Sequence, residues 1–177
     1  MIGGRVFRRA EAIIKNRQDN VMPSFIHQGI RLNYRDEGAG EAVVFLHEFG
    51  GDARSWDQQV DRLSQHSRCR FRSLVLNARG YPPSDVPETA DAYGWQENRD
   101  DVIALLDHLQ IEKAHIVGLS MGGYIALTLG LAAPERCLTI VCASSGSGAH
   151  PPTREAFIQD SITSAERILK DRQIPAE

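Results

Sequence analysis

The stretch His115–Glu135, HIVGLSMGGYIALTLGLAAPE, decides the fold because it joins an apolar strand to an apolar helix through a serine. Within it, residues 118–122 read GLSMG, the pattern G-x-S-x-G, and Ser120 stands where the strand gives way to the helix. Such a turn is so tight that a side chain two residues before or after the serine would clash with neighbouring backbone. The sequence therefore indicates a strained turn with Ser120 as a candidate nucleophile.

Small residues recur on the helix that follows. Gly122, Ala126 and Gly130 occupy every fourth position, which gives the helix a smooth face that can lie close to a sheet. Its N-terminal amides would then stand behind Ser120, where they favour developing negative charge. The alternative is that Ser120 is an ordinary helix cap in a glycine-lined turn. A cap does not need glycine on both sides, so the pattern favours a nucleophile.

Strands and helices alternate along the rest of the chain. An opening hairpin is expected around Gly29, and apolar runs predict four further strands, whereas helical spacing of apolar residues predicts the segments between them. The predicted strands include 42–46, FRSLVLNARG at 71–80, KAHIVGLS at 113–120 and CLTIVCASSG at 137–146; the predicted helices are one carrying Trp56, Val60 and Leu63, one at 100–109 with acids in its first turn, 121–133, and roughly 153–172. This alternation predicts an α/β fold, a mainly parallel sheet with helices on both faces.

Unusual residues gather where the predicted strands end. The segments 47–51, 77–85, 118–122 and 144–150 each follow one of them. Ligands of such sheets bind beyond the carboxyl ends of the strands. The convergence of four strand ends predicts a site at that edge.

Three motifs in chain order carry a family resemblance: HEFGG at 47–51, NARGYPPSD at 77–85 and GLSMGG at 118–123. Over roughly residues 25–146 the chain resembles the α/β-hydrolase fold superfamily, in its serine hydrolase and esterase-like branch. The resemblance implies a twisted, mainly parallel sheet that is incomplete at its C-terminal side. Residues 1–20 would form a basic helix or arm, 21–149 a partial core and 150–177 the beginning of a helical lid.

The resemblance also implies roles for individual residues. Ser120 is similar to the family's nucleophile, and the backbone N–H groups of Met121 and Phe49 correspond to its two oxyanion donors. The supporting positions are His47, Gly50, Gly51, Gly118, Gly122 and Arg79. Serine at position 120, where Asp or Cys would suggest an epoxide hydrolase, haloalkane dehalogenase or dienelactone hydrolase, implies hydrolysis of an ester, thioester, lactone or carbon–carbon bond, or acyl transfer.

Two departures from the family pattern stand near these residues. Glu48 replaces a usual glycine and puts a carboxylate near the oxyanion site. Asn77 and Pro82 depart from the pattern Asp-x-Arg-Gly-x-Gly-x-Ser, although Arg79 remains. We expect Arg79 to tie loops together rather than touch substrate.

Ser120 needs a general base to act as a nucleophile, and the motifs above do not supply one. His150, the one histidine after Ser120, is the candidate base within the chain, but the only acid between them, Glu135, falls at the wrong end of the helix. The family would continue beyond Glu177 with a further acid and histidine. Three readings stay open: a truncated or partial form of a hydrolase, a catalytically silent binding or interaction module, or a site completed by another chain.

The composition limits the class of protein and its partners. The 177 residues carry a formal charge of -3, with 42% hydrophobic and 24% charged residues, which is typical of one soluble domain and argues against nucleic acid or anionic membrane as a partner. The resemblance implies no metal and no organic cofactor. It does imply a small-molecule substrate. A sheet edge left exposed would favour a homodimer.

Three cysteines bear on location. They show no metal-ligand spacing, and Cys137 and Cys142 stand five positions apart in one predicted strand, which predicts opposite faces. Buried free thiols favour the cytoplasm.

Overall fold

A computed structural model describes residues 22–65 and 70–146, together with the isolated positions 155, 156, 159 and 163. Six strands form one sheet in the order β1-β2-β4-β3-β5-β6. They are β1 (Ser24–His27), β2 (Ile30–Gly38), β3 (Glu41–Leu46), β4 (Phe71–Leu76), β5 (Ala114–Leu119) and β6 (Cys137–Ala143). The predicted arm at 1–20 and, apart from the four isolated positions, the predicted lid at 150–177 lie outside the described residues.

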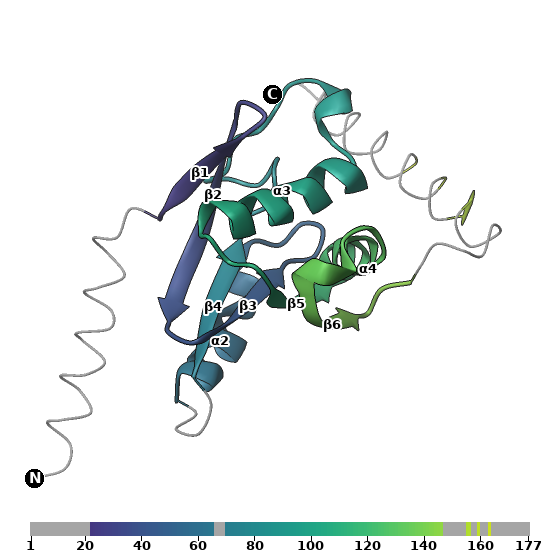
Figure 1. Ribbon diagram of the computed structural model, residues 1–177. Coiled ribbons are helices and arrows are strands. Elements are labelled where there is room, and N and C mark those ends of the chain that lie inside the picture. The colour runs from purple at the N-terminus through teal and green to yellow at the C-terminus, as the bar shows by residue number, and fades with distance from the viewer. Residues whose placement is uncertain (1–21, 66–69, 147–154, 157–158, 160–162, 164–177) are drawn as a thin grey trace, which may run out of the picture.

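The sheet is mainly parallel, as predicted. Strands β3, β4, β5 and β6 pair in parallel, whereas β1 and β2 form an antiparallel hairpin that joins the sheet at β4 (Figure 1). The connections contain η1 (Ala53–Trp56), α2 (Asp57–Gln65), η2 (Ala90–Ala92), α3 (Trp95–His108), α4 (Met121–Ala132) and η3 (Pro134–Arg136). In the described part of the chain no helix combines the length and the apolar character that a membrane span needs.

Alternate residues of the central strand pack on opposite faces of the sheet. Val44 and Leu46 of β3 join the larger core under α3 and α4, which cross the front of the sheet in Figure 1. Val43 and Phe45 join a second core with Trp56 and α2 on the other face. The prediction of helices on both faces is therefore confirmed.

The path of the chain defines where a site should lie. Strand β3 leads into α2 on one face, and its neighbour β5 leads into α4 on the other. Adjacent parallel strands whose connections leave to opposite faces open a crevice beyond their carboxyl ends. The segments at this point are the 47–51 loop after β3 and the 118–122 turn after β5, which we call the elbow.

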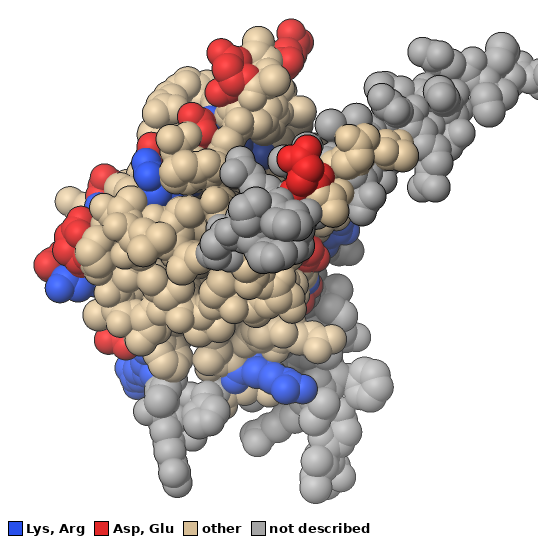
Figure 2. All heavy atoms as spheres, turned by 90° about the vertical axis from the view of Figure 1, so that its right-hand side faces the viewer, with Lys and Arg blue, Asp and Glu red and all other residues tan. Residues whose placement is uncertain are grey.

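Strand β6 differs from the other parallel strands. It pairs with β5 at the edge of the described sheet, and Leu138, Ile140 and Val141 are exposed. Seen from the right-hand side of Figure 1, where α4 and β6 lie, the centre of the face carries almost no charged side chains (Figure 2). The apolar run predicted the strand correctly, but not its position at an edge.

The prediction that Cys137 and Cys142 lie on opposite faces of the strand is wrong. A register shift pairs Cys137 with Ala114 but Thr139 with His115, so one extra residue of β6 enters the ladder there. As a result both thiols face α4, where Cys137 Sγ contacts the carbonyl of Ala133 and Cys142 Sγ that of Gly123. Both are free, Cys137 is half-buried and Cys142 is exposed.

Helix α3 begins earlier than its apolar stripe predicted. It starts at Trp95 rather than near Asp100, because its first turn, WQEN, carries none of the stripe. Asp101 therefore lies in the second turn and is buried, with an exposed fraction of 1%. It is not a solvated charge at the helix start but a partner of the β4 loop, described below.

Candidate active site

Ser120 occupies the turn between β5 and α4 with φ 50° and ψ -110°. Residues other than glycine rarely adopt a positive φ, so the backbone is strained there. The residue is exposed, and its side chain makes no capping hydrogen bond to the helix. The hydroxyl is therefore not used as a cap and is presented at the surface.

Glycine at the elbow has a steric reason. A Cβ on Gly118 would lie 2.0 Å from the carbonyl oxygen of Gly122, and a Cβ on Gly122 would lie 2.2 Å from that of Leu46. The second contact shows how closely the start of α4 approaches the end of β3. Further along the helix, a Cβ on Gly130 would lie 2.0 Å from Cδ1 of Ile140 in β6, so the small-residue face lies against the sheet.

The 47–51 loop is anchored by His47, which is 1% exposed. Its Nδ1 donates to the carbonyl of Glu48 at 2.8 Å, and its Nε2 accepts from the amide of Ala78 at 3.1 Å. The ring is thus neutral with its proton on Nδ1. Burial lowers the pKa of His47, only partly offset by the carbonyl and the charge of Glu48. With both nitrogens engaged, His47 holds the loop and is not placed to act as a base.

Glu48 fits its position by folding back along its own loop. Its Oε1 accepts from the Ser55 hydroxyl at 2.9 Å, and a Cβ on Gly51 would lie 2.4 Å from the same oxygen. The Gly51 amide donates to the Glu48 carbonyl at 3.1 Å and closes the turn, while Gly50 has φ 77°. The Glu48 carboxylate is therefore directed at the start of η1.

The loop and the elbow converge. His47 and Met121 line one internal void of about 10 Å³, which is no larger than a single water requires. Neither the Phe49 nor the Met121 amide donates in any loop or cap hydrogen bond of the described chain. The Phe49 side chain is 81% exposed. Two amide donors on the two facing loops are thus available to a ligand.

The loop after β4 braces this arrangement from the side. Arg79, whose side chain is 1% exposed, donates to both carboxylate oxygens of Asp101 at 2.7 Å and to the carbonyl of Ala92 at 2.7 Å. Asp101 Oδ1 is also 2.7 Å from Nδ1 of His27. The Arg79 guanidinium is fully engaged in joining α3, η2 and the β4 loop, and it does not face a ligand.

Asn77 serves where the family pattern has Asp. Its Oδ1 accepts from the amide of Ala53 at 2.7 Å and so fixes the start of η1. The Ser84 hydroxyl donates to the Asn77 carbonyl at 2.8 Å. An amide oxygen is as good an acceptor here as a carboxylate, so this departure leaves the loop intact.

Sequence reasoning missed two residues of this region, Asp101 and Tyr81. The Tyr81 hydroxyl lies 3.4 Å from the Gly50 amide and 3.8 Å from Met121 Sδ, so it touches both the loop and the elbow. Its place directly after Arg79-Gly80 at a strand end was the available signal.

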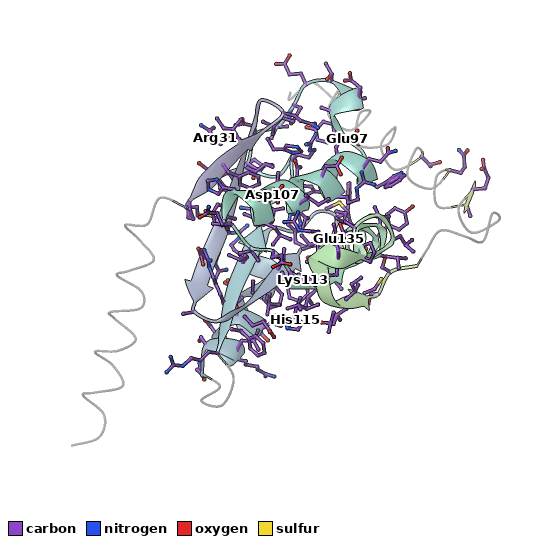
Figure 3. All side chains as sticks on the ribbon, in the orientation of Figure 1. Arg31, Glu97, Asp107, Lys113, His115 and Glu135 are labelled. Atoms are coloured by element: carbon purple, nitrogen blue, oxygen red, sulfur yellow. The ribbon has the colours of Figure 1, made fainter. Side chains whose placement is uncertain are left out.

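No described histidine is placed to serve Ser120 as a base. His115 is bound to Glu41 at 2.6 Å and to Thr139 at 2.7 Å, at the end of the sheet opposite Glu97 and the start of α3 (Figure 3). His27 is held by Asp101 and His108 stacks on Phe25; His150 lies outside the described residues. Within the described ranges no three His, Cys, Asp or Glu side chains are grouped as a metal site would require.

Two larger hollows lie away from the elbow. One of about 510 Å³ lies between β1 and α3, and one of about 440 Å³ lies on the α2 face beside Trp56 and Val117. Neither includes Ser120 or the 47–51 loop among its lining residues. The surface at Ser120 is open rather than enclosed.

Comparison with known proteins agrees with this fold. The profile of the alpha/beta hydrolase fold family matches residues 41–169, and the chain belongs to that family. It is 35% identical over 120 residues to a 2-hydroxy-6-oxononadienedioate/2-hydroxy-6-oxononatrienedioate hydrolase of Paraburkholderia xenovorans (strain LB400), covering 67% of this chain and 41% of that protein. It is 38% identical over 122 residues to 3-oxoadipate enol-lactonase 1 of Acinetobacter baylyi, covering 68% and 43%.

A solved structure of a hydrolase from Pseudomonas aeruginosa PA01 is similar with a TM-score of 0.66 at 30% identity, over 89% of this chain and 64% of that one. The named relatives are hydrolases of small molecules. The chain spans about two fifths of the length of these curated relatives.

Proposed function

We propose that the protein is a serine hydrolase that acts on a small ester-like molecule: a carboxylic ester, a thioester or a lactone. Ser120 Oγ would form a bond to the acyl carbon while the bond from that carbon to the leaving oxygen or sulfur breaks. The serine proton would pass through a general base to the leaving group, and water would then release the acid. The observation that carries the proposal is the exposed Ser120 hydroxyl, free of any capping role, on a strained backbone.

Charge stabilisation supports the same chemistry. The Phe49 and Met121 amides lie on the 47–51 loop and the elbow, beyond the carboxyl ends of β3 and β5, and are free to bind an oxyanion. One such donor lowers the barrier by about 3 kcal/mol. The N-terminus of α4 at Ser120 adds a favourable dipole.

The general base is assigned to a histidine and an acid outside the described residues, since the rings of His27, His47, His108 and His115 are engaged elsewhere. Under this proposal residues 21–149 form part of a hydrolase core, 150–177 begin a lid and 1–20 form an arm. The free thiols of Cys137 and Cys142 favour the cytoplasm as its location.

A catalytically silent binding or interaction module is the second candidate. It is favoured by one observation, that the four described histidines are engaged elsewhere and none is placed to deprotonate Ser120. Such a protein would keep the elbow and its two amides as a binding site for a carbonyl or an anion.

Labelling by a fluorophosphonate separates the two. We expect the full chain to gain one phosphonyl group on the peptide that contains Ser120, as seen by mass spectrometry, and Ser120→Ala to gain none. Ser64→Ala is the matched control, because Ser64 lies in α2, where its hydroxyl donates to the Asp61 carbonyl at 2.8 Å, and it should label as the wild type does. A folded wild-type chain that stays unlabelled would contradict the hydrolase and favour the silent module.

A further inference from the structure

Tyr81 stands between the two loops of the candidate active site. Its ring meets His47 edge-on with centroids 4.7 Å apart, and it meets Phe49 edge-on at 6.4 Å. Both contacts are to the 47–51 loop, while the hydroxyl reaches across to the elbow at Met121. The ring is half-buried, so its orientation is fixed by packing rather than by solvent.

The two partners of the hydroxyl adjoin the two proposed oxyanion donors. The Gly50 amide donates to Tyr81 Oη at 3.4 Å, and Gly50 directly follows Phe49. Oη in turn donates to Sδ of Met121 at 3.8 Å, and the backbone amide of that residue is the other proposed donor. The phenol group thus lies at the junction of both loops, where the oxygen of a bound acyl group would be held.

Both of these contacts are weak. A 3.4 Å separation is long for an N–H···O hydrogen bond, and a thioether sulfur is a poor acceptor. A half-buried tyrosine hydroxyl ordinarily finds a stronger partner. The Tyr81 proton is therefore available to a better acceptor than Met121 Sδ.

The hydroxyl also stays protonated near neutral pH. Burial raises the pKa of Tyr81, and the nearby charge of Glu48 raises it further, although the Gly50 amide acts in the opposite direction. A neutral phenol can donate a hydrogen bond but cannot serve as a base at that pH.

We propose that Tyr81 is a third hydrogen-bond donor of the acyl site, whose hydroxyl leaves Met121 Sδ and binds the substrate's carbonyl oxygen as it becomes an oxyanion. The inference rests on the proposed function, since it assumes that Ser120 attacks a carbonyl carbon. Tyr81 keeps its proton throughout, and no bond to it forms or breaks. Its contribution is charge stabilisation, added to that of the Phe49 and Met121 amides.

The rate of Ser120 labelling by diisopropyl fluorophosphate tests the role. The Oγ–P bond forms, fluoride leaves, the serine proton passes to the buffer, and the phosphoryl oxygen takes the place of the oxyanion. We expect Tyr81→Phe to slow labelling about tenfold, which is less than the loss on removing a main oxyanion donor. Tyr93→Phe is the matched control: its hydroxyl donates to the Pro87 carbonyl at 2.7 Å, so its labelling should stay within about twofold of wild type.

Tyr81→Leu removes the aromatic ring as well as the hydroxyl. Comparing it with Tyr81→Phe therefore separates the effect of the hydroxyl from that of the ring. If the hydroxyl acts as proposed, Tyr81→Phe already labels slowly, and Tyr81→Leu labels no faster, since it also loses the ring contacts to His47 and Phe49. Labelling of Tyr81→Phe at the wild-type rate overturns the role of Tyr81 and leaves the proposed hydrolase standing, whatever the Leu variant does. An unlabelled wild-type chain overturns the hydrolase and the role of Tyr81 together.

Discussion

At Ser120 the backbone holds a conformation that only glycine adopts without cost. A residue in such a region is destabilised by about 1 to 3 kcal/mol, whereas glycine loses roughly 0.5 to 1 kcal/mol through the entropy of the unfolded chain. We therefore expect Ser120→Gly to be more stable than Ser120→Ala by about 1 kcal/mol, as measured by urea unfolding. Both variants lack the hydroxyl, so the difference isolates the backbone.

Ser64 provides the control for this comparison. It is an exposed residue in the last turn of α2, where glycine is less favourable than alanine by up to about 1 kcal/mol. The order of the two substitutions should therefore reverse at position 64. A Ser120→Gly variant that is no more stable than Ser120→Ala would contradict the strained elbow.

His47 gives the unfolding free energy a pH dependence of known sign. Its pKa is lowered in the folded protein by burial, from an ordinary value of about 6.5. As pH falls below that value, the unfolded chain binds a proton that the folded chain does not, so stability is lost progressively. Above it, both states are neutral at this residue and the stability is fully present.

Thermal melting between pH 7.5 and 5.5, a window of about two units around the ordinary histidine pKa, checks this contribution. The loss of melting temperature on acidification should be smaller in His47→Gln than in the wild type, even though the variant starts lower. An equal loss in both would mean that His47 is protonated in the folded protein and does not hold the loop as a neutral ring.

How far sequence predicts residue roles depends on whether the residue acts locally. Gly118 is dictated by a turn within five residues, since a Cβ there would meet Gly122. Gly122 is required by the approach of Leu46 in β3, although the G-x-S-x-G pattern indicated both glycines. Tyr81 and Asp101 act through partners that are distant in sequence, Met121 and Arg79. An acid near a helix start is ordinarily solvated, so Asp101 carried no signal of burial.

At the scale of elements, helix α4 is positioned by glycine, and two of its glycines differ in what opposes them. A Cβ at position 122 would meet the backbone of β3, which cannot move, whereas one at 130 would meet the terminal methyl of Ile140. We expect Gly122→Ala to cost about 3 kcal/mol, the upper end for overpacking. Gly130→Ala should cost less, since alanine regains about 1 kcal/mol of helix propensity.

Urea unfolding of the two alanine variants side by side measures the difference. They share the helix and the substitution, so only the opposing atoms differ. Equal losses, or a larger loss at 130, would mean that α4 does not rest on the end of β3 and that the elbow is held in another way.

The positions of the strands along the chain could be predicted from the sequence, but their order in the sheet could not. The strands 41–46, 71–76 and 114–119 were evident because each contains a continuous apolar run, AVVFL, LVL and IV respectively, as expected where a strand is covered on both faces. The same signal in β6 did not reveal an edge position, since which strands neighbour one another is decided by the whole chain. The cysteine faces failed for a related reason: a register shift adds a residue that alternation does not count.

At the scale of the whole molecule, the exposed edge of β6 should promote self-association. Its apolar residues are uncovered, with Val141 48% exposed, and its outer backbone groups have no partner strand in the described chain. We expect the full chain to associate with rising concentration, as seen by light scattering after size exclusion. Val141→Lys should weaken the association, because a charged edge resists pairing.

Val86→Lys is the control for that change. Val86 is 56% exposed but lies in the loop before η2 rather than on β6. It should leave the association unchanged. If both lysine variants associate as the wild type does, the β6 edge is not the surface through which copies meet.

The account as a whole depends on Ser120 forming an ester with the acyl group of its substrate. The most direct measurement is mass spectrometry of the peptide containing Ser120 after incubation of the full chain with p-nitrophenyl acetate. The account predicts one acetyl group on Ser120, with matching release of p-nitrophenol, and no acetyl group on the same peptide of Ser120→Ala. An unmodified Ser120, or acetylation of other side chains alone, would contradict it.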